Sequence, residues 1–157
     1  MIDALQDFTS SLPPVLQWLG VMVAAALPFI ESYFGSVIGV LAGINPVVAI
    51  AAAIAGNVIS MLIFVLGAHR VRSKVVSGRE VIEPSARRQK LRSRFDKYGV
   101  AGVSLLGQTI LPSQITSAAM VSFGASRNVV IAWQTVSIIL WGVAFGVFAS
   151  LGFAMIG

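Results

Sequence analysis

Residues 46–68 decide the fold class of this chain, and they read PVVAIAAAIAGNVISMLIFVLGA. Asn57 and Ser60 are the only clearly polar side chains in this stretch. As an α-helix at about 1.5 Å per residue the stretch would be about 34 Å long, enough to cross a hydrocarbon core of about 30 Å. It therefore predicts a membrane-spanning helix. The helix should begin at Asn45-Pro46, because the residue before a proline avoids the helical conformation.

The composition of the whole chain also favours a membrane protein. Hydrophobic residues make up 57% of its 157 residues and charged residues 11%, whereas a soluble domain carries about 25% charged residues. So few charges cannot cover a water-facing surface. The chain has no cysteine and one histidine, which excludes disulfides and thiolate metal sites. We expect neither a metal nor a cofactor.

Positive charge is concentrated in the segment that follows the first span. Ten of the eleven Lys and Arg residues lie within residues 69–98, and the positive-inside rule places this segment in the cytoplasm. A helix there would carry Leu91, Phe95 and Tyr98 on one face, which suits an anionic membrane surface. A solvated charged linker is the alternative. Since apolar stretches flank the segment, we expect no nucleic-acid partner.

Two further apolar segments are each interrupted by a proline and polar side chains. Pro28 and Glu31 interrupt residues 15–44, and Pro112 lies in a polar run within residues 100–123. Irregular backbone at membrane depth is tolerated where it is buried in protein or lines a cavity. We therefore interpret both segments as re-entrant hairpins, the first opening to the outside and the second to the cytoplasm.

A second spanning helix is predicted over residues 129–156, so that each half of the chain is a hairpin followed by a span. The halves share a Leu-Pro pair followed by an Asn, at Leu27-Pro28 with Asn45 and at Leu111-Pro112 with Asn128. Inverted repeats with broken helices are a transporter architecture. The predicted fold is thus an all-α integral membrane protein of two inverted repeats. A basic amphipathic cytoplasmic helix lies between them.

Four short motifs in this order resemble a known family. They are residues 27–31 (LPFIE), 97–103 (KYGVAGV), 111–112 (LP) and 123–127 (FGASR). Their order and spacing, over most of the chain, are similar to the small multidrug export proteins, which are related to the DedA/VTT (SNARE-associated) superfamily.

The resemblance implies two inverted hairpins that share a site at the membrane midplane, in the cytoplasmic membrane of a prokaryote. In the superfamily an acid in the first hairpin is important for function, and Glu31 takes that position. Bacterial DedA proteins are associated with moving undecaprenyl phosphate, driven by the proton gradient, and eukaryotic relatives scramble phospholipids. The superfamily also places arginines around the second hairpin's proline, where this chain has Gln108 and Gln114.

Glu31 is the only carboxylate within an apolar stretch. A charged residue at the centre of a bilayer costs about 2.5–3.5 kcal/mol on insertion scales, and such residues are usually functional. We therefore expect Glu31 to be a proton or substrate site. The alternative is that it marks a water-exposed loop between two helices.

The polar run around Pro112 is the second candidate site, formed by Gln108, Thr109, Ser113, Gln114 and Thr116. Helix ends aimed inward would attract anions there without an arginine. The alternative is that these side chains satisfy the backbone broken by the proline.

Arg127 and a set of glycines complete the candidate residues. Arg127 can reach a lipid headgroup, with a snorkelling anchor as the alternative. Glycines four residues apart allow close helix packing, either within the chain or in a homodimer. They are Gly35, Gly39, Gly43, Gly142 and Gly146.

The leading interpretation is a DedA-like, proton-coupled transporter or flippase that moves a lipid phosphate such as undecaprenyl phosphate. One alternative is a proton-coupled exporter of small cationic or amphipathic drugs. Another is a non-transporting membrane adaptor whose basic segment is a docking patch. We expect no enzyme, because the sequence holds no acid pair, nucleophile–base arrangement, P-loop or dinucleotide fingerprint. The expected partners are membrane lipids and the substrate.

Overall fold

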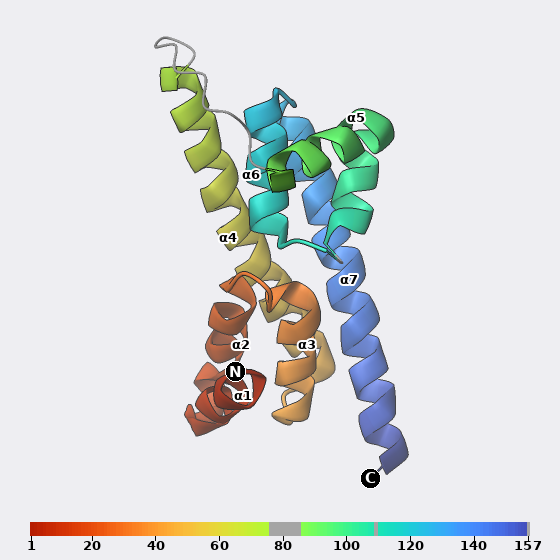
Figure 1. Cartoon of the computed structure of the whole chain (residues 1–157). Helices are drawn as coiled ribbons and strands as arrows, with labels where there is room; N and C mark the ends of the chain where they lie inside the picture. Colours follow the sequence, from red (N-terminus) through yellow and green to blue (C-terminus); the bar gives the residue numbers. More distant parts are fainter. Residues whose placement is uncertain (76–85, 109, 157) are drawn as a thin grey trace. The chain divides into compact units, whose positions relative to one another are not determined.

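The computed structural model describes residues 1–75, 86–108 and 110–156 (Figure 1). In these ranges the regular secondary structure is seven α-helices and one 3-10 turn, without a β-strand. The elements are α1 (Ile2–Ser11), η1 (Pro14–Leu16), α2 (Gln17–Ala26), α3 (Glu31–Leu41), α4 (Pro46–Val75), α5 (Ala86–Gly107), α6 (Ser113–Phe123) and α7 (Arg127–Ile156). The predicted all-α fold is confirmed for the described residues. Residues 76–85 of the predicted cytoplasmic segment lie outside them.

Two helices are long and apolar enough to cross a membrane. They are Pro46–Val71 within α4 and Arg127–Gly152 within α7, with mean hydropathies of 2.4 and 1.9. Helix α4 begins at the predicted Asn45-Pro46 break, where the Asn45 side-chain oxygen accepts a hydrogen bond from the Val47 N–H at 3.0 Å. Such a bond satisfies one of the unpaired donors at a helix start.

The chain forms two compact units, and the division between them falls within α4 and α7. Unit 1 comprises Met1–Ser60 and Ile138–Gly157, and unit 2 comprises Met61–Ser137. Each long helix therefore contributes one part to each unit. Each unit also contains two helices joined by a turn, α2 and α3 in unit 1 and α5 and α6 in unit 2.

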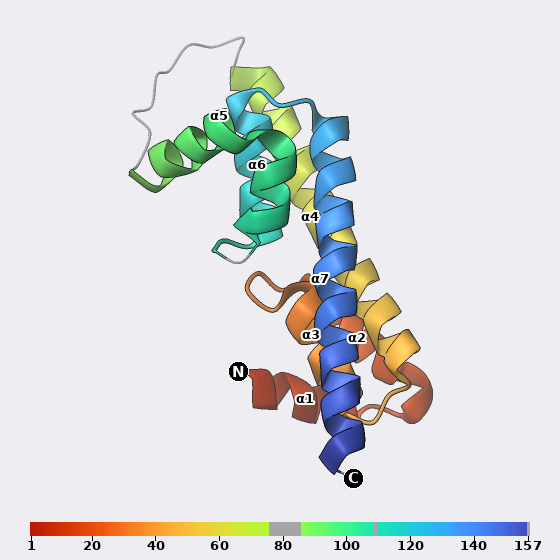
Figure 2. The same ribbon diagram turned by 90° about the vertical axis from the view of Figure 1, so that its right-hand side faces the viewer.

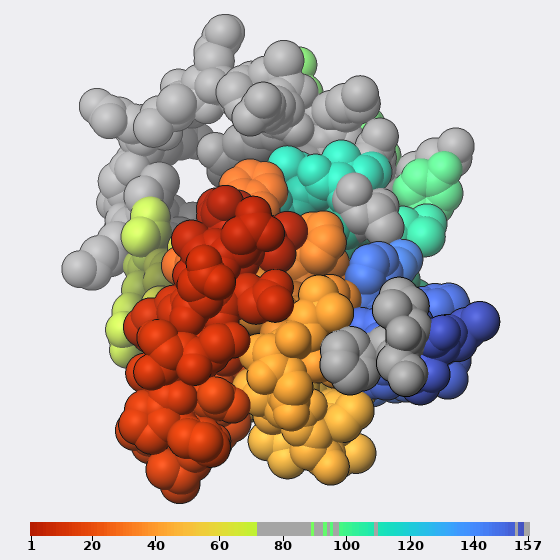
Figure 3. Space-filling view, turned by 90° about the horizontal axis from the view of Figure 1, so that it is seen from below, coloured from red at the N-terminus to blue at the C-terminus, as the bar shows by residue number. Residues whose placement is uncertain are grey.

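In unit 1, α2 and α3 lie side by side and antiparallel, and α1 packs against both (Figures 1 and 3). The helices approach closely because the contact positions are glycine and alanine. A Cβ atom on Gly35 would lie 2.6 Å from the Cβ of Ala25 in α2, and one on Gly39 would lie 2.6 Å from the Cβ of Ala49 in α4. Neither position has room for a side chain.

The C-terminal half of α7 also packs in unit 1 through glycines. A Cβ on Gly142 would lie 3.0 Å from Ile54 Cγ1 and 3.1 Å from Ser32 Cβ. A Cβ on Gly146 would overlap the side chain of Ile50. These two glycines, like the two of α3, therefore meet neighbours in the same chain.

Helices α3 and α6 end in the same way, on a glycine with a left-handed backbone. The φ angles are +79° at Gly43 and +112° at Gly124. After α3, the N–H of Ile44 donates to the Gly39 carbonyl at 3.1 Å, and after α6 the N–H of Ala125 donates to the Met120 carbonyl at 3.0 Å. This pattern is a Schellman motif, which terminates helices. Gly43, unlike the other predicted packing glycines, lies in open space.

In unit 2, α5 bends at Gly99, where φ is +67° and ψ is −174° (Figure 2). The part of α5 after the bend packs against α6. The part before the bend brings the Phe95 ring to a centroid distance of 6.3 Å from the Phe123 ring of α6. The positive φ angle explains why a glycine stands at the bend.

Residues 100–123 do not form one continuous helix. Helix α5 ends at Gly107, whose carbonyl accepts hydrogen bonds from the N–H groups of Ile110 and Leu111, both at 2.9 Å. Helix α6 starts directly after Pro112. Pro28 lies in the corresponding turn between α2 and α3. Insertion of these helix pairs into a membrane as re-entrant hairpins stays a prediction.

Candidate functional site

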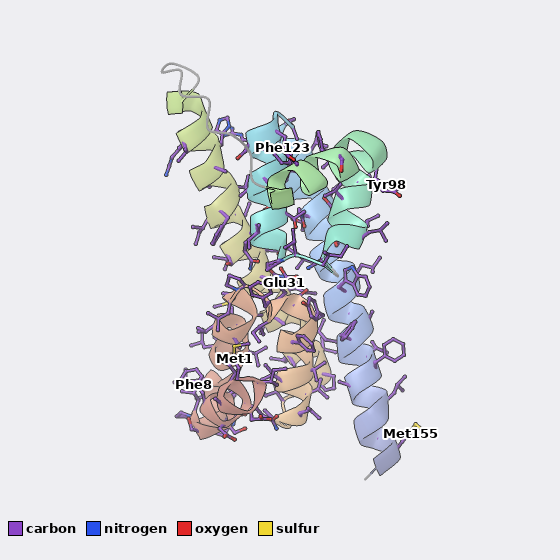
Figure 4. The ribbon with its side chains drawn as sticks, in the orientation of Figure 1. Met1, Phe8, Glu31, Tyr98, Phe123 and Met155 are labelled. Atoms are coloured by element: carbon purple, nitrogen blue, oxygen red, sulfur yellow. The ribbon has the colours of Figure 1, made fainter. Side chains whose placement is uncertain are left out.

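Glu31 is the first residue of α3 and lies at the turn that follows α2 (Figure 4). Phe29 and Glu31 have φ angles of +75° and +54°, which are uncommon for residues other than glycine. The N–H groups of Ile30 and Glu31 both donate to the Leu27 carbonyl, at 3.2 and 3.3 Å. The Glu31 side chain is 0% exposed, whereas Phe29 is 59% exposed. The carboxyl group therefore lies inside the protein, at the helix end whose dipole favours negative charge.

Two buried serines hold the beginning of α3 in place. The Ser32 hydroxyl donates to the Ile138 carbonyl of α7 at 2.8 Å. One turn later, the Ser36 hydroxyl donates to the Ser32 carbonyl at 2.6 Å. Since Ser32 is adjacent to Glu31, its bond to α7 fixes the helix end that carries the carboxyl group.

Aromatic rings of α3 and α7 pack against one another in unit 1. The Tyr33 ring centroid lies 4.8 Å from that of Phe34 and 5.5 Å from that of Phe145. The Trp141 centroid lies 5.9 Å from that of Phe145. The Glu31 carboxyl group is close enough to interact electrostatically with Tyr33. A carboxyl group and an aromatic ring that lie near one another can together attract an organic cation.

The polar residues around Pro112 come together in unit 2. Gln108, Ser113, Gln114 and Thr116 are all buried, and Thr109 lies outside the described residues. Some of these groups satisfy local backbone, as the alternative interpretation predicts. The Thr116 hydroxyl donates to the Leu111 carbonyl at 3.4 Å. Bonds to local backbone therefore explain part of this polar run. The partner of Gln108 is a side chain and not the local backbone.

Gln108 belongs to a buried polar cluster between α5 and α7 that the sequence analysis missed. The Ser137 Oγ lies 2.8 Å from the Ser104 carbonyl oxygen and 2.5 Å from Gln108 Oε1. Gln134 lies one turn before Ser137 on the same face of α7. The sequence signal for this cluster was the spacing of its polar residues. Ser104 and Gln108 are four residues apart, and Gln134 and Ser137 are three residues apart within an otherwise apolar helix.

Several atoms of this cluster have no hydrogen-bond partner among the described residues. They are Ser104 Oγ, Gln108 Nε2, Gln134 Nε2 and Gln134 Oε1. Buried polar atoms are nearly always paired with protein or water. Four such atoms from three neighbouring side chains mark a place where a polar ligand or water would gain hydrogen bonds.

An apolar pocket of about 240 Å³ lies in unit 2 between α5 and α6. Its lining includes the exposed Tyr98 (labelled in Figure 4) and Ile110, the partly exposed Gly107 and the buried Thr116. Gly107 keeps this space open, because a Cβ there would lie 3.3 Å from Thr116 Cγ2. Because the pocket is apolar, it suits a hydrocarbon chain.

Charge is sparse inside the described part of the protein. Among the residues whose burial the structure describes, Glu31 is the only charged one that is buried. Arg127 starts α7 and is exposed. The described residues contain no group of three or more His, Cys, Asp or Glu side chains that could hold a metal ion.

Comparison with protein-family models, curated proteins and solved structures finds no match for this chain. The resemblance to the DedA/VTT superfamily therefore rests on the motifs in the sequence. Family membership stays a prediction.

Proposed function

We propose that this chain is a membrane transporter of the DedA/VTT kind, which moves a lipid phosphate such as undecaprenyl phosphate and is coupled to protons through Glu31. The observation that carries the proposal is the Glu31 carboxyl group, fully buried at the turn between α2 and α3. Burying a carboxyl group in an apolar protein is energetically unfavourable. Such a residue usually exchanges a proton or binds a cation.

The two long helices support a membrane location. Only 39% of the apolar window in α4 and 22% of that in α7 are buried, whereas the core helix of a soluble protein would be mostly buried. Large apolar side chains therefore face outward, among them Ile63 at 65% and Phe148 at 73% exposed. Lipid is the surrounding in which such a surface is stable. We place the basic residues 69–98 in the cytoplasm of a prokaryote.

The lengths of the helices support an inverted repeat. Helices α3 and α6 each have 11 residues, each ends in a Schellman motif, and each precedes a 30-residue helix. If the chain repeats a unit of one hairpin and one spanning helix, the helix lengths and helix ends of its two halves should agree in this way. In transporters built from such repeats, broken helices contribute the groups of the substrate site.

Unit 2 supplies groups that suit a lipid phosphate. The unpartnered amide and hydroxyl groups near Gln108 can hold phosphate oxygens. The start of α6 carries no side-chain cap, and a helix N-terminus favours anions. The apolar pocket between α5 and α6 can take part of the hydrocarbon tail.

The test is transport of undecaprenyl phosphate in proteoliposomes made with the wild type, Glu31→Gln and Asp7→Asn. Asp7 is an exposed acid of α1, so Asp7→Asn is a matched control for the loss of one carboxylate. We expect transport driven by a pH gradient in the wild type and the control, and background rates for Glu31→Gln. Equal rates in all three proteins would refute the role of Glu31.

The second candidate is an exporter of small organic cations. It is favoured by Tyr33, which interacts electrostatically with the carboxyl group and belongs to a cluster of rings with Phe145 and Trp141. It is also favoured by the lack of a buried cation among the described residues. The same proteoliposomes decide between the candidates. Uptake of tetraphenylphosphonium that depends on Glu31, without lipid movement, would select the exporter.

A further inference from the structure

Gln134 is the most isolated buried polar side chain of unit 2. It is 1% exposed, and neither its Nε2 nor its Oε1 has a hydrogen-bond partner among the described residues. A buried amide without a partner is unfavourable, because it has lost its water without replacing it. Its presence in an otherwise apolar helix therefore needs an explanation.

Contacts of Ser137 show what Gln134 faces. The Ser137 hydroxyl is within hydrogen-bond distance of the Ser104 carbonyl and of Gln108 Oε1. This face of α7 is thus turned to α5, and Gln134 lies on it one turn earlier. Ser104 Oγ and Gln108 Nε2, for which the described part of the chain also offers no partner, belong to the same interface.

The unpartnered groups have a surplus of donors. Each side-chain amide offers two N–H groups and the serine hydroxyl offers one, while Gln134 Oε1 is the one unpartnered amide oxygen. Helix α6 starts after Pro112, four residues beyond Gln108, without a side-chain cap, and adds the positive end of its dipole. The cluster therefore suits a ligand with several acceptor oxygens and one hydroxyl hydrogen.

We propose that Ser104, Gln108 and Gln134 form a site without formal charge that binds a phosphate monoester in its singly protonated form. The inference rests on the proposed movement of a lipid phosphate and names the form that is bound. The unprotonated phosphate oxygens accept from the two amides and from Ser104, and the P–OH group donates to Gln134 Oε1. Phosphate monoesters take up this proton near pH 6, so the singly protonated form is available in cells.

Binding of decyl phosphate to the full chain in nanodiscs tests the site, with Gln134→Leu and Ser104→Ala as variants. Gln17→Leu and Ser122→Ala are matched controls, since both parent residues already bond to backbone carbonyls away from the cluster. A hydrogen bond to a charged group is worth about tenfold in affinity or more. We expect losses of about that size for the two variants and unchanged affinity for the controls.

The stability of the free protein shows whether a variant binds phosphate more weakly only because its fold is disturbed. Replacing a buried amide that has no partner should leave Gln134→Leu at least as stable as the wild type in thermal unfolding. Gln134→Met provides a second apolar replacement if Gln134→Leu does not fold. Weaker binding with retained stability supports the site, and unchanged binding by either folded variant overturns it.

Related ligands test the chemistry. Methyl decyl phosphate and decyl sulfate have similar chains but no P–OH group, so we expect both to bind at least about tenfold more weakly. The ³¹P signal of bound decyl phosphate should keep the singly protonated position at a higher pH than that of the free ester. Inorganic phosphate distinguishes a headgroup site from a site for the free anion. Equal binding of diester and monoester would overturn the role of the P–OH group, and no binding of any phosphate would mean that the amides hold only water.

Transport separates failure of this inference from failure of the proposed function. If Gln134→Leu binds and moves the lipid normally while Glu31→Gln does not move it, the phosphate site is wrong and the transporter proposal stands. If Glu31→Gln moves the lipid like the wild type, the proton-coupled function fails, and the binding data still decide the phosphate site.

Discussion

The Ser32 hydroxyl donates a hydrogen bond to the Ile138 carbonyl at 2.8 Å, across 106 positions of the chain. Both residues are buried in unit 1. This bond joins the first turn of α3, which begins with Glu31, to the middle of α7. The candidate proton site is therefore held by a contact between distant segments, as well as by its own turn.

Ser32→Ala should lower the free energy of unfolding by about 1 kcal/mol, the usual net contribution of an internal hydrogen bond. Ser11→Ala is the matched control, because the Ser11 hydroxyl donates to the Phe8 carbonyl at 2.7 Å at an exposed position. Its removal should change stability by less than about 0.5 kcal/mol. Denaturant titration in detergent measures both, and equal losses would contradict a stabilising role for the Ser32 bond.

Gly35→Ala should destabilise unit 1 by about 1–3 kcal/mol, the usual cost of overpacking. The new methyl group would lie 2.6 Å from Ala25 Cβ and 3.3 Å from Ala25 Cα, and neither atom can rotate away. Gly67→Ala is the control, since nothing lies within 4 Å of that position, and alanine should stabilise the helix by up to about 1 kcal/mol. Thermal unfolding of both variants gives the two signs, and a neutral Gly35→Ala would disprove the close contact between α2 and α3.

The parts of the fold that local sequence determines were predictable. Residues 46–68 are apolar enough to specify a long helix wherever they pack, and α4 begins at the proline as predicted. Pro28 and Pro112 each mark a turn between short helices, because proline restricts the residue before it. Gly43 shows the limit of spacing arguments. It follows Gly39 by four residues, yet α3 ends before it and its left-handed backbone forms the turn.

The sequence could not show which residues of the candidate site meet, because these residues are far apart in the chain. Ser137 meets Gln108 across 29 positions, so their contact depends on how α5 packs against α7. In the sequence, Gln134 and Ser137 are only brief interruptions of an apolar run. The burial of Glu31 depends in the same way on tertiary structure. From the sequence alone, both a proton or substrate site and a water-exposed loop were therefore open.

The backbone at Phe29 predicts an order of stability between two variants that both remove the ring. The φ angle of +75° is tolerated by asparagine and is unfavourable for a β-branched residue. Phe29→Asn should therefore be more stable than Phe29→Val by about 1 kcal/mol, although valine is the more apolar residue. Urea unfolding of the two variants tests the order, and a more stable Phe29→Val would argue against the left-handed turn before Glu31.

The pocket between α5 and α6 predicts a dependence of transport on chain length. In Gly107→Leu the new side chain would extend into the space of about 240 Å³ that Gly107 lines. It should block a long hydrocarbon chain there while leaving the Ser104 and Gln108 cluster intact. We expect slower movement of undecaprenyl phosphate and nearly normal movement of a hexyl phosphate ester. Gly67→Leu, placed in open space on α4, should move both lipids like the wild type. Equal slowing of the long and short esters in Gly107→Leu would show that the pocket does not hold the chain.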